Sequence, residues 1–396
     1  MNSYDVIVLG AGAAGLMCAA QAGAKGRRVL LLDHADEAGA KILISGGGRC
    51  NFTNLDCAPD RFLSANPHFV KSALSRYTQR DFIGLVERHR IAYHERTLGQ
   101  LFCNGSAREI VAMLLAECAA ARVDIRTGMK ITDVAHGGEF RVATDRGMFG
   151  ARSLVLATGG KSIPKIGATG FAYDVARRFG LAVVEPRPGL VPLTFEGASL
   201  DFCRGLSGIS TDSVVSFGKR CFREALLLTH RGLSGPAILQ ISSYWKPGEP
   251  LIIDMLPDVD LAAVLLDRKR SRPKAEAHTI LAEFLPARLA QAIAREVGID
   301  GVMGGQSDKT LAALAQRVKS WRVLPSGTEG FAKAEVTVGG IDTSCLSSQT
   351  MEARTMPGLH AIGEAVDVTG CLGGYNFQWA WSSGWAAGQA IGAEQT

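Results

Sequence analysis

Three glycines near the start of the chain have the spacing of a dinucleotide-binding loop. Gly10, Gly12 and Gly15 follow an apolar run and precede a segment of small residues, and Asp33 closes the next apolar run. This order is the fingerprint of a site for the ADP half of a cofactor. The glycines let the backbone turn and approach a pyrophosphate, and the acid accepts a hydrogen bond from a ribose hydroxyl. The alternative is a glycine-rich turn that binds nothing. The residues predicted to form this site are Gly10, Gly12, Ala13, Ala14, Gly15, Asp33 and His34.

Two later segments decide between NAD and FAD, which share the ADP half. One apolar run ends in two glycines at 159–160, and another near the C-terminus delivers Gly363 and Glu364. A cofactor that touches both ends of the chain must be long, as FAD is, and no second fingerprint provides a dedicated NAD(P)H domain. We predict non-covalent FAD, with NAD(P)H as a transient co-substrate. The predicted contacts are Ala157, Thr158, Gly159, Gly160, Gly363 and Glu364, the last bonding a ribityl hydroxyl unless Asp367 competes for that place.

Between these segments lies a cationic, glycine-rich loop. Lys41 and Arg49 flank three consecutive glycines, so exposed amides and positive charge could reach a phosphate or the flavin ring. The alternative is a flexible surface loop. Cys50 is either a packed thiol or a redox centre, and it has no neighbouring cysteine or evident base. The predicted cofactor residues here are Lys41, Gly46, Gly47, Gly48, Arg49, Cys50 and Asn51.

Gly373 and Gly374 precede a helix-like segment at 375–391. The amides at the start of such a helix stabilise the negative charge of a reduced flavin near N1 and the C2 carbonyl. We predict contacts from Gly373, Gly374, Tyr375, Asn376, Phe377 and Gln378, the amide side chains by hydrogen bonds and the aromatic rings as walls or packing. Lys130 and Ile131, at the start of an expected strand, are predicted to offer backbone groups to the adenine.

Other reactive side chains form no recognisable constellation. His230 is as consistent with a structural hydrogen bond as with substrate contact, and His360, inside an apolar strand, is interpreted as a packed residue. The sequence contains no Ser-His-Asp order, no HExxH motif and no metal-ligand cluster. We therefore predict no metal site, and we identify no catalytic residue or proton donor.

The pattern of apolar runs predicts the elements that position these residues. Strands are expected at 4–9, 28–33 and 153–157, with helices at 11–23, 80–90 and 107–121. Consecutive apolar residues in the strands are typical of a parallel sheet covered on both faces. We predict an α/β fold with a discontinuous Rossmann-like FAD domain at 1–189 and 334–396, a β-rich insert at 190–257 and a helical insert at 258–333.

Composition and charge restrict the class of protein. The chain has 396 residues, 47% of them hydrophobic, and its net charge of +5 is too small to argue for nucleic acid or membrane. The dense basic stretch at 267–274 is interpreted as a solvated loop, with an anion or partner patch as the alternative. No targeting segment or membrane span is evident, and nine scattered cysteines favour reduced thiols in the cytoplasm.

Four blocks of the sequence carry a resemblance to a known family. The segment 41–54, KILISGGGRCNFTN, and the segment 363–380, with its GGYNFQWA motif, resemble the signatures of the BaiN/YhiN-like flavoproteins. This family includes aminoacetone oxidase-like enzymes and is related to the glutathione-reductase superfamily. The segments 229–237 and 336–340 resemble the same family. The resemblance implies an FAD domain with a β-barrel-like insert and a small helical insert, and it places 41–54 along the flavin.

The resemblance also implies the type of reaction. Members of the family reduce conjugated C=C bonds with NAD(P)H or oxidise small primary amines with dioxygen. We expect an NAD(P)H-linked reductase of a small organic substrate, acting by hydride transfer through flavin N5. The alternative is an amine oxidase that releases hydrogen peroxide. Flavin-dependent RNA modification and a non-catalytic redox sensor are ranked lower, because the charge gives little support for RNA and no nucleic acid or membrane partner is expected. The sequence does not predict the oligomeric state.

Overall fold

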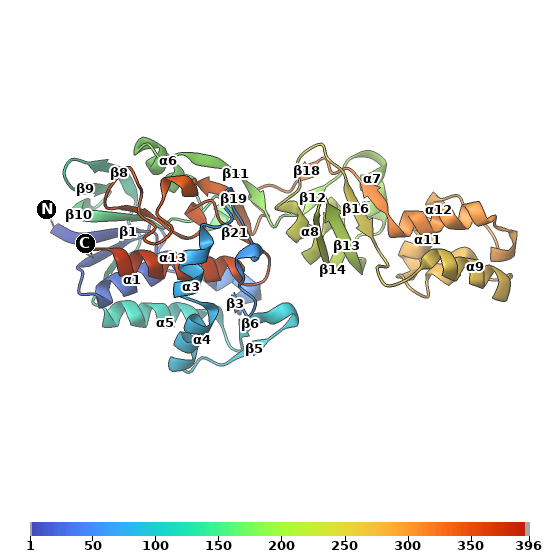
Figure 1. Ribbon diagram of the computed structural model, residues 1–396, viewed down its shortest axis with the longest axis horizontal. Coiled ribbons are helices and arrows are strands. Elements are labelled where there is room, and N and C mark those ends of the chain that lie inside the picture. The colour runs from blue at the N-terminus through green and yellow to red at the C-terminus, as the bar shows by residue number, and fades with distance from the viewer. Residues whose placement is uncertain (1, 393–396) are drawn as a thin grey trace. The chain divides into compact units, whose positions relative to one another are not determined.

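The computed structural model describes residues 2–392 and divides the chain into two compact units. The first contains residues up to Arg187 and from Val336 onward, and the second is Pro188–Glu335 (Figure 1). The first unit is therefore discontinuous in sequence. Each unit has its own hydrophobic core, and the two are described separately below.

The first unit is built on a sheet whose central strands are parallel. β1 (Asn2–Leu9) lies between β2 (Val29–Leu32) and β10 (Gly147–Leu156); β7 (Asp124–Arg126) extends the sheet beyond β2, and β20 (Leu359–Ala361) pairs with β10. The residues from Val6 to Leu9 and the whole of β2 are buried, as expected for parallel strands covered on both faces. Because these strands are parallel, their carboxyl ends meet at one edge of the sheet, which we call the carboxyl edge.

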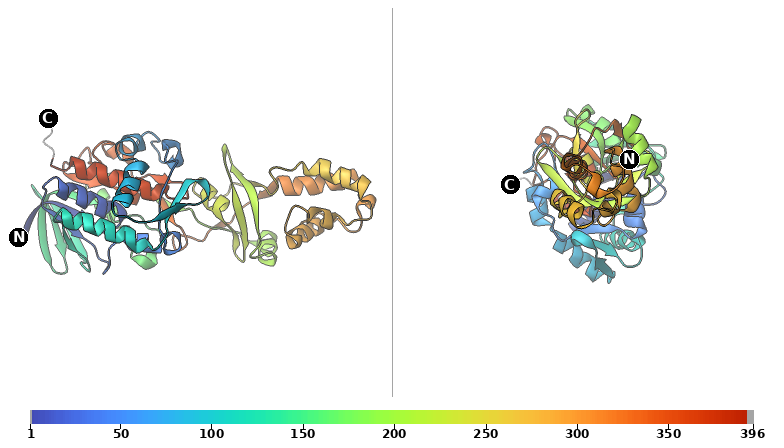
Figure 2. Two further views of the ribbon diagram at one scale, coloured as in Figure 1. Left: turned by 90° about the horizontal axis from the view of Figure 1, so that it is seen from below. Right: turned by 90° about the vertical axis from the view of Figure 1, so that its right-hand side faces the viewer.

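The N-terminal half of β10 belongs to an antiparallel ladder with β8 (Ile131–His136) and β9 (Phe140–Thr144). Among the helices, α1 (Ala13–Ala24) packs against α5 (Ala107–Ala120) and α13 (Tyr375–Ala390), and both figures show α1 and α13 side by side (Figure 1; Figure 2). A methyl group at Gly384 of α13 would lie 2.5 Å from the Ala14 carbonyl oxygen. Small residues therefore allow the first and last helices of the chain to approach closely.

Smaller elements complete the first unit. A three-stranded sheet that the sequence analysis did not predict has the order β3 (Asn51–Asn54), β6 (Gln100–Cys103), β5 (Tyr93–Glu95). Two further pairs are β4 (Phe62–Leu63) with β21 (Thr369–Gly370), and β11 (Val183–Gly189) with β19 (Val336–Ile341). The remaining helices are α2 (Ala40–Ile44), α3 (Val70–Arg76), α4 (Gln79–Arg88) and α6 (Phe171–Arg178).

The second unit has an antiparallel sheet and four consecutive helices. The strand order is β17 (Trp321–Val323), β16 (Leu251–Asp254), β13 (Ser210–Phe217), β14 (Arg220–Thr229), β15 (Gly232–Ser234), β12 (Leu193–Thr194) and β18 (Gly327–Thr328). Two helices accompany the strands, α7 (Gly197–Gly205) and α8 (Pro236–Ser242). The four consecutive helices, α9 (Leu261–Ser271), α10 (Ala277–Leu281), α11 (Ala287–Glu296) and α12 (Asp308–Lys319), gather at one end of the unit (Figure 2).

The strands and helices of the second unit share one core, to which Leu251, Ile253, Leu265, Leu289 and Leu314 all contribute. Along the chain, the second unit has most of its strands first, then the four consecutive helices, and then β17 and β18. These last two strands return to the sheet from within the range 258–333 that was expected to be helical. The structure therefore groups the β-rich and helical segments in a single compact unit.

The interpretation of the basic stretch 267–274 as a loop is wrong for its first half. Helix α9 continues through Ser271, since Asp260 caps its start by accepting a hydrogen bond from the Ala263 amide, and the residues that follow are good helix formers. The helix ends just before Pro273, because a proline disfavours helical geometry in the residue that precedes it.

Candidate functional site

The glycine loop lies at the carboxyl edge, between β1 and α1. Gly10 has a φ of +107°, and a methyl group there would lie 2.4 Å from the Ala157 carbonyl oxygen of the neighbouring strand end. A methyl group at Gly15 would lie 1.9 Å from the Gly10 carbonyl oxygen, so this glycine lets the helix begin against the loop. Gly12 has no neighbour within 4 Å of that position. Two glycines are thus required by packing, and the third leaves space in front of the helix.

The start of α1 suits an anion. Gly12 is its N-cap and supplies no side-chain acceptor, and the first turn contains no acid. The first amides of a helix and its dipole favour a negative group such as a pyrophosphate. The space in front of Gly12 and these donors together fit the phosphates of a dinucleotide.

Asp33 holds the glycine loop in place. One of its carboxylate oxygens accepts from the Ala11 amide at 2.6 Å, and the other accepts from the Ala35 amide at 2.8 Å. Each oxygen keeps a lone pair for a further donor, so these bonds are compatible with the predicted bond from a ribose hydroxyl. His34 is half-exposed and lies against Gly167, where a methyl group would be 2.3 Å from the imidazole Nε2 atom.

The segment after β10 contains a buried hydroxyl without a partner. Within the described residues, the Thr158 Oγ1 atom is buried and has no hydrogen-bond partner. Gly159, at a φ of +72°, has open space where a side chain would be. An unsatisfied buried hydroxyl is costly unless a water or ligand bonds it. Thr158 and Gly159 therefore fit a bound cofactor at the predicted place.

Glu364 is the centre of a network that links four distant segments. Its Oε2 atom accepts from the Lys41 ammonium at 2.5 Å, and its Oε1 atom accepts from the Ser162 hydroxyl at 2.8 Å and the Thr337 amide at 2.9 Å. The Lys41 ammonium also donates to the Ser162 oxygen at 2.6 Å. Gly160 must lack a side chain, because a methyl group there would be 2.3 Å from the Thr337 Oγ1 atom. The carboxylate predicted to bind a ribityl hydroxyl is thus largely engaged within the protein.

We call Lys41, Ser162, Thr337 and Glu364 the Glu364 network. The sequence analysis gave no role to Ser162 or to Thr337, although Thr337 lies in the segment 336–340 that resembles the family. The competing acid, Asp367, is only 4% exposed and accepts from the Ala65 amide at 2.9 Å. Burial raises the pKa of the Asp367 carboxyl, and the charge of Arg187 opposes this.

The loop at 46–48 has three glycines with positive φ, and Gly47 and Gly48 face open space. Gly46 instead packs against Phe102, where a methyl group would be 2.8 Å from the ring. Arg49 is exposed and forms no ion pair within residues 2–392. Of the two cations that flank the glycines, Lys41 is paired with Glu364, and Arg49 has no carboxylate partner among the described residues.

Cys50 is fully buried, and burial raises the pKa of its thiol. A buried thiol with a raised pKa is a poor nucleophile at neutral pH. This geometry matches the packed alternative for Cys50. The next residue, Asn51, can accept from the Gly374 amide at 3.2 Å and donate to the carbonyls of Thr53 and Leu101.

The start of α13 lies against β3. A methyl group at Gly374, which has a φ of +97°, would be 2.4 Å from the Thr53 carbonyl oxygen. The N-cap of α13 is this glycine, without a side-chain acceptor. The first amides of α13 are thus placed to meet a negatively charged group, as predicted for the flavin.

The side chains expected to bond the flavin from α13 have other partners. Asn376 exchanges hydrogen bonds with both backbone groups of Gly370, at 2.8 and 2.9 Å. Gln378 is fully buried, accepts from the Thr53 hydroxyl at 2.7 Å and donates to Ser382 at 3.0 Å. The prediction of cofactor bonds from these two amides is therefore corrected to structural bonds that fix the start of α13.

Aromatic packing explains two more predicted residues. Phe377 stacks on Trp381 with an interplanar angle of 11°, and Trp381 stacks on Phe82 at 7°. Tyr375 meets Phe62 edge to face, and burial raises the pKa of the Tyr375 hydroxyl. These rings support the helix start from both sides.

Lys130 cannot offer its amide to an adenine, because that N–H donates to the Asp145 carboxylate at 3.0 Å. The adenine contact stays a prediction for Ile131. His360 is buried with its ring bonded to the Thr350 carbonyl at 3.0 Å, and burial lowers its pKa, which fits a packed residue. His230 is exposed.

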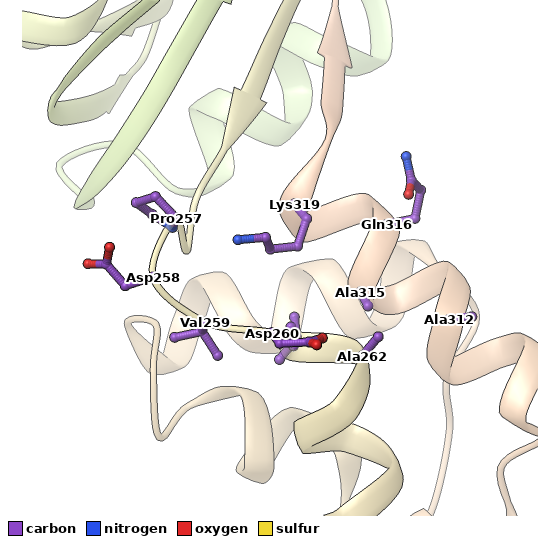
Figure 3. A pocket seen from close by; sticks show the side chains of 10 residues that line it. Pro257, Asp258, Val259, Asp260, Ala262, Ala312, Ala315, Gln316 and Lys319 are labelled. Carbon is purple, nitrogen blue, oxygen red and sulfur yellow. The ribbon is translucent and has the colours of Figure 1, made fainter.

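A cavity of about 560 Å³ lies in the second unit and contains none of the predicted residues. Its lining comes from the start of α9 and the end of α12, including Asp260 and Lys319 (Figure 3). Lys319 is paired with Asp254 at 2.9 Å, and Asp258 is paired with Arg223. Lys319 and Asp258 are thus already paired, and Asp260 accepts from the Ala263 amide as the cap of α9.

Residues 2–392 contain no group of three or more side chains that could hold a metal ion. No helix of the described chain has the length and apolar character needed to cross a bilayer.

Comparisons with known proteins place this geometry in a family. The model of the HI0933-like protein Rossmann domain matches residues 4–390. Two relatives named ribosomal RNA dihydrouridine synthase are similar along their whole lengths. The one from Escherichia coli is 51% identical over 99% of this chain and 98% of its own. The one from Haemophilus influenzae is 45% identical over 99% of both chains.

Two further similarities are more distant. A 3-dehydro-bile acid delta(4,6)-reductase from Clostridium scindens is 28% identical over 98% of this chain and 99% of its own. The crystal structure of a 3-ketosteroid-delta4-(5alpha)-dehydrogenase from Rhodococcus jostii has a TM-score of 0.51 at 15% identity, covering 98% of this chain and 97% of that one. At such identity the solved structure bears on the fold alone.

The chain belongs to the HI0933-like family, an FAD-binding Rossmann family among the FAD-dependent oxidoreductases. The predicted α/β fold class is confirmed, as is the predicted flavoprotein class. The resemblance to the wider family is confirmed as well, but the named relatives are not aminoacetone oxidases.

Proposed function

We propose that this protein reduces the C5=C6 bond of a uridine in ribosomal RNA, using FAD and NAD(P)H. The observation that carries the proposal is 51% identity over 99% of the chain to a relative named ribosomal RNA dihydrouridine synthase. Similarity along the whole length means that the insert, as well as the cofactor domain, is shared with that relative. A location in the cytoplasm, expected from the sequence, is part of this proposal.

The reaction type agrees with the one favoured by the sequence analysis, but the substrate differs. In uridine the C5=C6 double bond is conjugated to the C4 carbonyl, and in dihydrouridine this bond is saturated. The sequence analysis expected a small substrate and no nucleic acid, because the net charge is only +5. The names of the two relatives favour the RNA alternative instead.

When bound, FAD would carry hydride from NAD(P)H to the double bond. The residues of the first unit hold its parts. The amides at the start of α1 and the open space at Gly12 suit the pyrophosphate, and Asp33 suits the adenosine ribose. The Thr158 hydroxyl offers an unused donor, and the amides at the start of α13 suit the pyrimidine end of the flavin.

Hydride addition at C6 of a uracil places negative charge on O4 through the conjugated carbonyl. A fixed cation or amide close to that oxygen lowers the barrier. Arg49 is the candidate for this role in the first unit, since it is exposed, unpaired and adjacent to the open glycines 47–48.

The test is the dihydrouridine content of ribosomal RNA. Deleting the gene from its host should abolish dihydrouridine at one or more rRNA positions, as measured by nucleoside mass spectrometry and site mapping. Purified holoprotein with NADH or NADPH should restore it on rRNA from the deletion strain. Unchanged dihydrouridine in the deletion strain, together with no product in the restored reaction, would refute the proposal.

A second candidate is an NAD(P)H-linked reductase of small conjugated ketones. It is favoured by 28% identity over 98% of the chain to the relative named 3-dehydro-bile acid delta(4,6)-reductase. Anaerobic bleaching of the flavin by NADH or NADPH, followed by reoxidation with a 4,6-dienone steroid or with rRNA, separates the two substrates. A parallel assay of peroxide release from small amines tests the oxidase alternative.

A further inference from the structure

We propose that a basic surface at the helical end of the second unit binds the phosphate backbone of the RNA substrate. We call it the basic tip, and its residues are Arg268, Lys269, Arg270, Arg272, Lys274 and Lys309. The identification of RNA as the partner rests on the proposed function.

The tip is one surface made from two distant segments. The end of α9 is tied to the start of α12 by the Lys269–Asp308 ion pair, at 2.7 Å. The loops beyond these helices also meet. The Gly304 amide donates to the Pro273 carbonyl at 2.9 Å, and the Met303 amide donates to the Ala275 carbonyl at 2.7 Å. Lys269 and Lys309 are about 40 positions apart in the sequence, and these contacts bring them to the same end of the unit.

Positive charge is in excess at the tip. Arg268 and Arg272 share a single carboxylate, Glu283, and Arg268 also lies 3.6 Å from Asp267. With Asp308, six cations face three ion-paired acids, and the two acids of the adjoining loops, Glu276 and Asp300, leave a local excess of one positive charge. The pKa of the Asp308 carboxyl is held below its ordinary value by Lys269 and, more weakly, by Arg270.

Three of these cations have no ion pair among the described residues. Arg270, Lys274 and Lys309 are exposed, and none of them lies within 4.0 Å of a carboxylate oxygen in residues 2–392. Their charges are therefore available to a partner.

Favourable interactions with the helix dipole do not explain the positions of all the cations in the basic tip. Cations in the last turn of α9 interact favourably with the helix dipole, which accounts for Arg270. Lys274 lies outside the helix, in the loop before α10. Lys309 lies in the first turn of α12, where a cation is unfavourable. An exposed cation in an unfavourable place indicates a gain from something outside the folded chain.

RNA phosphates are the partner that this chemistry fits. Lysine and arginine bind a polyanion by displacing its counterions, without reading the sequence. The tip has no exposed aromatic side chain for stacking on bases: its exposed apolar neighbour is Val302. We infer that the tip positions the RNA while the cofactor unit selects the base.

The experiment compares two triple variants of the full-length holoprotein. R270A/K274A/K309A removes the unpaired cations of the tip. K25A/K71A/R141A removes three exposed cations of the first unit that also form no ion pair in the described chain. Binding of a fluorescent rRNA transcript is measured by anisotropy between 50 and 300 mM KCl, alongside flavin content and anaerobic reduction by NAD(P)H.

The tip variant should bind the transcript about tenfold or more weakly at 150 mM KCl, with a slope of log K against log salt reduced by about 2. Its flavin content and reduction by NAD(P)H should equal those of the wild type, and the control variant should bind as the wild type does. Equal binding by the tip variant, or an equal loss in the control, would overturn the proposal. Because binding is scored without turnover, a wild type that forms no dihydrouridine refutes the proposed function separately.

Discussion

At the scale of single residues, the Glu364 network connects parts of the chain that are far apart in sequence. The Lys41 and Glu364 side chains are 31% and 17% exposed, so their ion pair is only partly screened by water. A largely buried carboxylate that accepts three hydrogen bonds, one of them from an ammonium, fixes the positions of all its donors. We therefore regard Glu364 as a positioning residue for the cofactor site.

Glu364→Gln should lower the free energy of unfolding of the apoprotein by about 1–3 kcal/mol, because it leaves the Lys41 ammonium without its counter-charge. Lys41→Met should have a similar effect, and the double variant should lose less than the sum of the two. Chemical denaturation measures stability, and fluorescence titration measures FAD affinity. If Glu364 acts mainly as a ribityl ligand, its substitution will weaken FAD binding while Lys41→Met does not, and the effects on stability will add.

Asp367 predicts a dependence of stability on pH. Burial raises the pKa of its carboxyl above that of the unfolded chain, so the native state binds more protons between the two values. The contribution of Asp367 is therefore favourable below the unfolded pKa, about 4, and is lost as the pH rises through the folded pKa. Asp367→Asn keeps an oxygen to accept from Ala65 but carries no charge.

The stability of Asp367→Asn relative to the wild type should accordingly increase as the pH is raised from 4 to 7. Urea denaturation at several pH values measures this difference. Asp342→Asn, at a partly buried acid that also raises the pKa of Asp367, is a suitable comparison for charge effects. A difference that stays constant or decreases with pH would contradict the assignment.

The cofactor site that the sequence motifs indicate stays a prediction, whereas the structure gives other partners to several of its side chains. Thr158 and Gly12 lie where the motifs predict, with an unused hydroxyl and open space. Gln378 and Asn376 were given to the flavin, because a sequence does not show that Thr53 and Gly370 are their partners. A long polar side chain beside a motif has many possible partners, and tertiary packing decides among them.

At the scale of elements, two glycines of the loop between β1 and α1 have different roles, one in packing and the other in the predicted binding of FAD. Gly15 is required by the helix start, and Gly12 faces open space with a φ of −83° that alanine also adopts. The same substitution should therefore have different effects at the two positions.

Gly12→Ala should change the stability of the apoprotein by no more than about 1 kcal/mol, because alanine restricts the unfolded chain but is a poorer N-cap than glycine. Its methyl group should occupy the space of the pyrophosphate and weaken FAD binding about tenfold or more. Gly15→Ala should destabilise the apoprotein itself by about 1–3 kcal/mol or more, because its methyl group overlaps the Gly10 carbonyl. Thermal denaturation of both apoproteins and FAD titration test this contrast, which fails if Gly12→Ala binds FAD normally.

Periodic apolar segments were the elements that the sequence predicted well. The expected helix at 107–121 corresponds to α5, Ala107–Ala120, and the expected strand at 28–33 to β2, Val29–Leu32. The sheet of β3, β6 and β5 was missed, because its strands are short and its middle strand, β6, pairs with β3, which lies far earlier in the sequence. Pairing between distant short strands leaves little local signal.

At the scale of the whole molecule, the two units have separate hydrophobic cores. All the residues predicted to bind FAD belong to the first unit, as do the members of the Glu364 network. The chain leaves this unit after β11 and returns to it in β19, and these two strands pair with each other. The ends of the first unit at the point of insertion are thus close together, so a short linker can join them.

Replacing residues 190–334 with a short Gly-Ser linker should leave a folded, yellow protein. Because no predicted FAD residue or first-core residue is removed, its FAD affinity should stay within about tenfold of the full chain, a difference below about 1.4 kcal/mol. The same protein should lose binding to the rRNA transcript, since the basic tip is gone. Absorbance of the bound flavin, FAD titration and anisotropy provide the three measurements. A soluble but colourless product that binds no added FAD would mean that the second unit completes the cofactor site, and retained RNA affinity would place the RNA contacts on the first unit instead.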